Sequence, residues 1–110
     1  MSIALIKREK RIRRRMLSIV DEARAAGGVR GRMLADILES LPEGLDGDME
    51  ALRLATDLVN LGLLSVADTR TLKSQRESLD YLVYRVTAKG TGLLAGVEPV
   101  CPLVEDDRIG

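Results

Sequence analysis

The chain has 110 residues with 17 basic and 17 acidic side chains, and it contains one cysteine and no histidine. This length predicts one domain with a modest core, the single cysteine rules out an internal disulfide, and the missing histidine removes the commonest general base and metal ligand. Tyr81 and Tyr84 are the only aromatic residues, which argues against a single-stranded nucleic-acid binder, because such proteins stack bases on aromatic side chains.

The first predicted element is a helix over residues 3–26, which a pair of glycines ends. Its apolar residues recur at helical spacing and form one stripe. The members of this stripe are Leu5, Ile12, Met16, Ile19, Val20 and Ala23. The stripe begins nearer to the N-terminus than the part of the helix that a core of this size would bury. Leu5 and Ile12 are therefore placed to meet a second copy, and we expect a homodimer through this helix.

The same helix carries the strongest electrostatic signal of the chain, because residues 1–15 contain seven basic side chains and a single acid, Glu9. Arginine donates two parallel hydrogen bonds to a phosphate, and segregated charges can give a neutral protein a local basic surface. We therefore expect contacts to the DNA backbone from Lys7, Arg11, Arg14 and Arg15. A solvated helix face, or a partner helix that supplies acids, would explain the same run.

A very short strand near Val29 and two further helices, over residues 32–41 and 49–61, are predicted next. Asp48 is the expected N-cap of the third helix. Residues 36–68 carry eight acids against one basic residue, so this third helix lies in the most acidic part of the chain.

The third helix is the element that would enter the major groove in a helix-turn-helix protein. Arg53 would donate two hydrogen bonds to a guanine, and Asn60 would pair with an adenine. Glu50 and Asp57 flank Arg53, and carboxylates repel the phosphates whose neutralisation supplies most of the binding free energy. The sequence therefore favours a helix that only packs, and it leaves open that the acidic face binds a basic protein partner.

Two antiparallel strands, over residues 64–71 and 79–86, are predicted from alternating side chains. The charged segment between them would be the tip of a hairpin, where Lys73 and Arg76 are candidate contacts to the DNA backbone. A solvated hairpin tip would have the same composition. Thr87 is expected to cap a last short helix.

The remaining patterns set the expected domain limits and exclude several kinds of chemistry. We expect one domain over residues 1–96 and an extended or disordered acidic tail over residues 97–110. The sequence has no nucleophile motif, phosphate-binding glycine loop or cysteine cluster, so we expect no enzyme, no cofactor and no metal. We also expect a cytoplasmic protein, since no apolar run approaches membrane-spanning length and the start does not have the order of a signal peptide.

Two stretches carry a resemblance to a known group of proteins: Leu-Val-Asn-Leu-Gly-Leu-Leu-Ser-Val at 58–66 and Val-Thr-Ala-Lys-Gly-Thr-Gly-Leu-Leu-Ala-Gly at 86–96. With the valine- and proline-containing tail, they resemble the small winged-helix proteins of Mu-like phages and prophages, often labelled ArsR-like regulators. The resemblance implies an α+β winged helix-turn-helix fold with a three-helix core, a two-stranded wing and a short C-terminal helix. It brings no catalytic residue, and the metal-sensing cysteines of true ArsR repressors are absent.

The function expected from these patterns is that of a DNA-binding winged-helix protein, either a transcriptional regulator or a DNA-associated phage protein. The alternative is a protein–protein interaction module on the same scaffold, such as an accessory of phage packaging or assembly. The candidate DNA-contacting residues are Lys7, Arg11, Arg14, Arg15, Arg53, Lys73 and Arg76.

Overall fold

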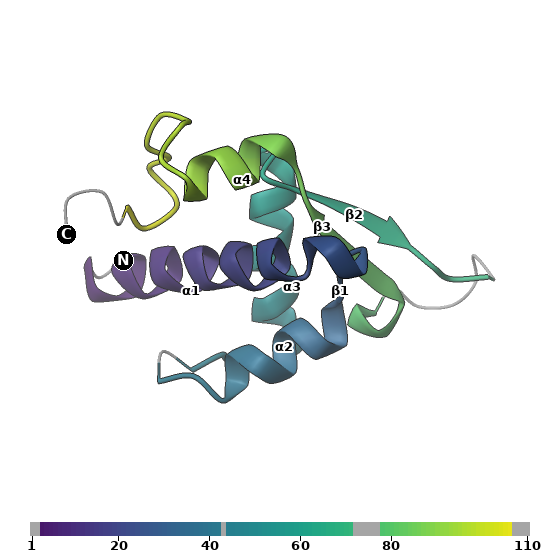
Figure 1. The fold of residues 1–110 in the computed structure, drawn as a ribbon. Coiled ribbons are helices and arrows are strands. Elements are labelled where there is room, and N and C mark those ends of the chain that lie inside the picture. Colours follow the sequence, from purple (N-terminus) through teal and green to yellow (C-terminus); the bar gives the residue numbers. More distant parts are fainter. Residues whose placement is uncertain (1–2, 43, 72–77, 107–110) are drawn as a thin grey trace.

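The computed structural model describes residues 3–42, 44–71 and 78–106. These residues form an α+β fold with one antiparallel sheet (Figure 1). Its α-helices are α1 (Ile3–Glu22), α2 (Gly31–Glu39), α3 (Gly47–Asn60) and α4 (Ala88–Leu94). Its strands are β1 (Val29–Arg30), β2 (Leu64–Asp68) and β3 (Leu82–Val86). Two short 3₁₀ helices, η1 (Arg24–Ala26) and η2 (Leu79–Tyr81), precede β1 and β3.

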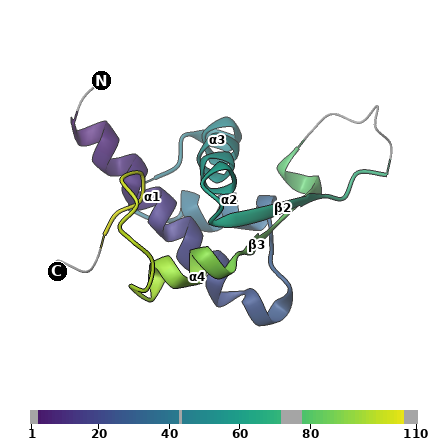
Figure 2. The ribbon, with the colours of Figure 1, turned by 90° about the horizontal axis from the view of Figure 1, so that it is seen from above.

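The long helix α1 organises the core, because it packs against α2, α3, α4 and β3. Figure 1 shows α1 crossing α3, with α2 and α4 on opposite sides of it, and Figure 2, seen from above, looks nearly along α3 with α1 passing beside it. The stripe predicted on the first helix is largely the side that is buried here. Its residues meet the apolar side of α3 in a core of aliphatic side chains that includes Met16, Leu17, Val20, Leu54 and Leu58, all fully buried.

The sheet has the order β1-β3-β2, so β3 is its central strand. Tyr84 in β3 lies opposite Val29 of β1 and Val66 of β2, and only 1% of it is exposed. Its neighbour Arg85 is exposed, which confirms the predicted alternation. The predicted second strand began at residue 79, but η2 occupies that position, because the Ser78 hydroxyl accepts a hydrogen bond from the backbone N–H at residue 80 and caps a 3₁₀ turn.

The start of α3 differs from the sequence-based prediction. The helix begins two residues earlier, and Asp46 holds the N-cap position without a hydrogen bond from its side chain to the helix. Asp48, the predicted N-cap, lies in the first turn and binds Arg32 of α2 at 2.6 Å. An ion pair with another helix has therefore replaced the expected local cap.

The predicted cap of the last helix is confirmed. The Thr87 hydroxyl accepts a hydrogen bond from the N–H of Gly90 at 3.0 Å and donates one to the carbonyl oxygen of Gly62 at 2.6 Å. One side chain thus starts α4 and ties it to the turn that follows α3.

The segment after α4 has no helix or strand in its described part, residues 97–106. It is nevertheless packed onto α1. Val104 is 2% exposed, Arg13 Nη1 donates to the Leu103 carbonyl at 3.0 Å, and the N–H of Glu105 donates to the Lys10 carbonyl at 3.2 Å. The described part of the tail, which the sequence predicts as extended or disordered, is therefore irregular, with a turn at residues 102–104, and it is bound to the core.

The chain order α1, β1, α2, α3, β2, β3 with the sheet order β1-β3-β2 is compatible with a winged-helix-like arrangement. In such an arrangement α3 is exposed along one side and the β2–β3 hairpin stands beside it. The hairpin tip, with Lys73 and Arg76, lies outside the described residues.

Candidate nucleic-acid interface

Helix α3 has a buried side, two charged flanks and an exposed side. Ala51, Leu54, Ala55 and Leu58 pack into the core. On the opposite side lie four exposed residues, here called the outward stripe: Met49, Arg53, Thr56 and Asn60. They recur at helical spacing, so their side chains leave the helix in nearly one direction. The structure describes every residue of α3, and none of these four is acidic.

Glu50 lies on the flank of α3 that faces α1, and Arg8 of α1 binds it with both terminal guanidinium nitrogens. The distances are 2.7 Å from Nη2 to Oε1 and 3.0 Å from Nη1 to Oε2. The same arginine donates to the Gly44 carbonyl at 2.8 Å, in the turn before α3. The hydrogen bond from Arg8 lowers the pKa of Glu50 below its ordinary value. The carboxylate is therefore held charged and paired.

Asp57 lies seven residues further along the same flank, and Arg13 of α1 binds it. Nη2 and Nε of Arg13 lie 2.9 and 3.2 Å from one oxygen of Asp57, and 7% of Arg13 is exposed. Since Arg13 also donates to the Leu103 carbonyl, it connects α1, α3 and the C-terminal segment.

The third carboxylate of α3, Asp48, lies on the other flank and is bound by Arg32 of α2 at 2.6 and 2.9 Å. Arg32 also binds Asp80 of η2 at 3.0 Å. The two hydrogen bonds raise the pKa of Arg32, and the bond from Arg32 lowers the pKa of Asp48. Asp48 is half exposed despite this pairing, and Asp46, just before the helix, is exposed as well.

Each carboxylate within α3 is thus neutralised by an arginine from another helix, and each lies beside the outward stripe rather than on it. The sequence could not place these pairs, because the partners of Glu50 and Asp57 are 42 and 44 residues away. A signal was nevertheless present. Arg8 and Arg13 belong to the basic run, but they lie on the side of the helix that carries the apolar stripe, where a solvated charge would not be expected.

Arg53, the proposed base reader, belongs to the outward stripe but also reaches α1. Its Nη1 and Nη2 each lie 3.2 Å from an oxygen of Glu9, and Nη2 lies 3.8 Å from Glu50. About half of its side chain, 51%, is exposed, whereas the Glu9 side chain is 13% exposed. Arg53 is therefore held at the edge of a protein-internal network with its outer surface open to solvent.

The basic candidates on α1 do not share a surface with Arg53. Lys7, Arg11 and Arg15 are exposed and Arg14 is half-buried. Helical spacing places Lys7, Arg11 and Arg14 on the side of α1 away from the residues that pack on α3, whereas Arg15 lies two turns after Arg8, at the edge of the α3-facing side. One straight duplex against the outward stripe would not reach Lys7, Arg11 or Arg14. In the hairpin, Arg70 binds its neighbour Asp68 at 2.8 Å, so its charge is neutralised locally.

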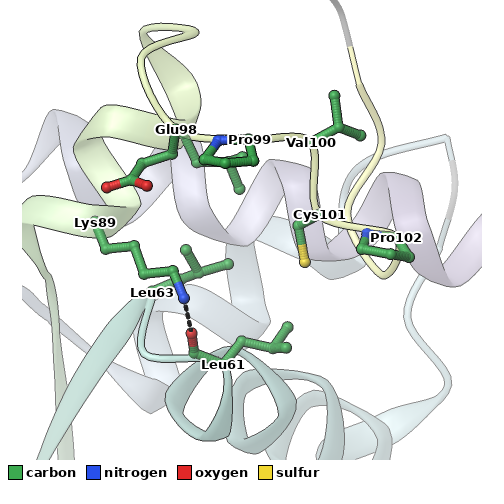
Figure 3. A pocket seen from close by; sticks show the side chains of 9 residues that line it. Leu61, Leu63, Lys89, Glu98, Pro99, Val100, Cys101 and Pro102 are labelled. Atoms are coloured by element: carbon green, nitrogen blue, oxygen red, sulfur yellow. Dashed lines mark hydrogen bonds between the residues drawn. The ribbon is translucent and has the colours of Figure 1, made fainter.

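A cavity of about 370 Å³ lies between the end of α3, α4 and residues 98–102 (Figure 3). Leucine, proline and valine side chains form most of its wall, and Cys101 and Lys89 also line it. Lys89 Nζ donates to the Leu61 carbonyl at 3.1 Å, where a cation complements the C-terminal end of a helix. The cavity lies beside the last turn of α3, and its lining contains none of the outward-stripe residues.

No protein-family model matches the chain, and no curated protein or solved structure matches it either. In the described ranges, no group of three or more histidine, cysteine, aspartate or glutamate residues is placed to hold a metal ion. No helix in those ranges is both long and apolar enough to cross a membrane. The function is therefore inferred from the geometry of α3 and its neighbours.

Proposed function

We propose that the protein binds double-stranded DNA, with α3 in the major groove and the β2–β3 hairpin against the backbone. The observation that carries this proposal is the outward stripe of α3. It presents Met49, Arg53, Thr56 and Asn60, while the carboxylates on both flanks are already paired with arginines.

The side chains of the stripe match the chemistry of base edges. Arginine pairs with the two acceptors of guanine, and asparagine pairs with adenine. The hydroxyl of threonine can donate to an acceptor or accept from a donor on a base edge. An exposed apolar side chain such as Met49, which is 79% exposed, suits the methyl group of thymine. Lys73 and Arg76, at the hairpin tip outside the described residues, are the expected phosphate contacts.

A role as a transcriptional regulator or as a DNA-associated phage protein is the more specific form of this proposal. It is supported by the resemblance of residues 58–66 and 86–96 to winged-helix proteins of Mu-like phages. The alternative, a scaffold that offers an acidic α3 to a basic partner, is less favoured because Arg8, Arg13 and Arg32 already occupy the carboxylates of α3.

The proposal is tested by measuring binding to a pool of duplexes with a randomised centre, at about 50 and 200 mM salt. The wild-type protein should bind and enrich particular sequences. Replacing Thr56 and Asn60 by alanine should weaken the sequence preference to the part that Met49 and Arg53 still read, while leaving salt-dependent, non-specific binding in place, because base contacts specify and phosphate contacts position.

The matched control replaces Lys7 and Arg11, two exposed basic residues on the outer side of α1, by alanine. This variant should keep the preferred sequence and most of the affinity. If it loses binding while the Thr56 and Asn60 variant is unchanged, the DNA surface is on α1 and the proposed docking is wrong. Absence of duplex binding at low salt would instead favour the interaction module.

A further inference from the structure

We propose that the cavity between the end of α3, α4 and residues 98–102 binds a small apolar carboxylate, with Lys89 holding the carboxylate group at the mouth (Figure 3). The proposal does not depend on DNA binding, because no residue of the outward stripe lines the cavity. Its volume of about 370 Å³ falls within the range of about 300–1,000 Å³ that is typical of small-molecule sites, near the lower end.

The wall of the cavity is mostly apolar, and it comes from three parts of the chain: the end of α3, helix α4 and the segment after α4. The apolar residues that matter most are Leu61, Leu63, Leu93, Pro99 and Pro102. Leu63 and Leu93 are only 1% and 5% exposed, so they belong to the core and form a fixed inner end. An apolar ligand would remove this wall from water, which is favourable in proportion to the area covered.

The segment after α4 covers the cavity but is attached to the rest of the protein mainly at its ends. At one end, the N–H groups of Val97 and Glu98 donate to the Gly92 carbonyl at 2.8 and 3.2 Å. At the other end, Val104 is 2% exposed and packs in the core. In the described part of the chain, no hydrogen bond joins residues 99–102 to the helices beneath them. The segment can therefore adjust to a ligand without losing a backbone hydrogen bond.

Lys89 determines the charge of the ligand, because it is the only cation that lines the cavity. Its Nζ donates to the Leu61 carbonyl at 3.1 Å, and this carbonyl is its only partner among the described residues. An ammonium group has three N–H donors, so two of them remain for a carboxylate and the bond to Leu61 is kept. Such a charge-assisted hydrogen bond is stronger than one to a neutral ligand.

Glu98 also lines the cavity, but it does not oppose this assignment. Figure 3 shows its carboxylate turned toward α4, whereas the Cys101 side chain points from the covering segment toward Leu61. A cationic ligand would need Glu98 and would be repelled by Lys89. The ligand that fits best is therefore an apolar chain or ring that carries one carboxylate.

The test uses octanoate as the probe and octanol as its uncharged counterpart of the same chain length. Both are titrated into protein with ¹³C-labelled methyl groups. Octanoate should bind saturably and shift the methyl signals of Leu61, Leu63 and Leu93, while the signals of α2, on the other side of α1, stay in place (Figure 1). Saturable binding without these shifts would contradict the assigned site.

Two variants with the same charge change separate the role of Lys89 from a general effect of charge. In Lys89→Gln, the ratio of octanoate affinity to octanol affinity should fall about fivefold, because an exposed charge-assisted hydrogen bond is lost. Lys7→Gln, at an exposed position of α1, is the matched control and should keep the wild-type ratio. An unchanged ratio in Lys89→Gln would overturn the role of Lys89.

Cys101→Phe supplies a further arm, because the larger side chain would occupy the space toward which Cys101 points. This variant should lose octanoate binding and keep its thermal midpoint, since the added ring fills a cavity instead of crowding a packed core. Octanoate that binds Cys101→Phe as it binds the wild type would overturn the proposal, and so would a wild-type protein that binds no octanoate. If the wild type binds no octanoate and Cys101→Phe lowers its sedimenting mass, the cavity holds a second copy of the chain instead.

Discussion

At the scale of single residues, arginines decide what α3 can present. Arg8, Arg13 and Arg32 each bind a carboxylate of α3 with two nitrogens. Arginine suits this role because its planar group binds a carboxylate through two parallel hydrogen bonds and stays charged at every relevant pH. The carboxylates of α3 are therefore paired within the protein, and none of them lies on the outward stripe.

The Arg8–Glu50 pair makes stability depend on pH in one direction. Because Arg8 lowers the pKa of Glu50 below 4.5, the unfolded chain takes up this proton at a higher pH than the folded chain does. The stabilisation is complete above about pH 4.5 and is lost as the pH falls through the lower folded value. Glu50→Gln should lower the free energy of unfolding by about 1–2 kcal/mol at pH 7.

Urea unfolding at pH 7 and pH 3 measures this effect. The variant should lose less stability between the two pH values than the wild type does. Glu39→Gln, at an exposed position of α2, is the matched control and should follow the wild type at both pH values. Equal losses for wild type and Glu50→Gln would contradict a stabilising charged pair.

At the scale of elements, the joint between α3 and α4 explains a sequence signal in physical terms. Thr87 caps α4 through the N–H of Gly90. A side chain at Gly90 would collide with the Leu63 carbonyl oxygen and would approach Val86 Cγ2 to 2.8 Å. The Thr-x-x-Gly pattern therefore combines a cap with a close approach between a helix and the backbone of the preceding turn.

Gly90→Ala should destabilise the protein by about 2 kcal/mol, because the obstacle is backbone and cannot move aside. Gly92→Ala is the matched control in the same helix. Its added methyl would meet only the flexible Glu98 side chain, at 3.0 Å, and alanine is the better helix former, so this variant should be neutral or more stable by up to about 1 kcal/mol. Equal thermal midpoints for the two variants would contradict the close packing.

Elements whose signals are local were predictable from the sequence, and those set by distant partners were not. The Thr87 cap, the glycine that ends η1 and the alternation around Tyr84 all depend on nearest neighbours, and each is observed, although the predicted first helix ends as α1 at Glu22 and only η1 reaches the glycines. Asp48 had the chemistry of an N-cap, but Arg32 competes for it. The candidate site was predicted only in part for the same reason, since the partners of Glu50 and Asp57 lie in another helix.

At the scale of the whole molecule, the first turns of α1 extend beyond the core. Ile3, Leu5 and Ile6 are 72%, 42% and 43% exposed. The prediction that Ile12 joins the same dimer contact is wrong, because Ile12 is 2% exposed and lies in the core of its own chain. The homodimer remains a prediction that now depends on residues 3–6 alone.

Sedimentation equilibrium at tens of micromolar, roughly where weak dimers still form, checks the oligomeric state. The wild type should sediment above its monomer mass of 12.0 kDa, and Ile6→Lys should return it to the monomer, because a charge would be buried in the contact. Met33→Lys, at an exposed position of α2, adds the same charge elsewhere and should leave the mass unchanged. A wild-type protein that remains monomeric throughout would contradict the dimer.

The most direct test of the DNA-binding surface is the change in backbone amide shifts when the ¹⁵N-labelled protein is titrated with duplex DNA. The largest changes should fall on the outward stripe of α3, at Met49, Arg53, Thr56 and Asn60, and on the strand ends that border the hairpin tip. The outer side of α1 should change little. Changes confined to α1 around Lys7 and Arg11, or no changes at low salt, would contradict the assignment of α3 as the DNA-facing helix.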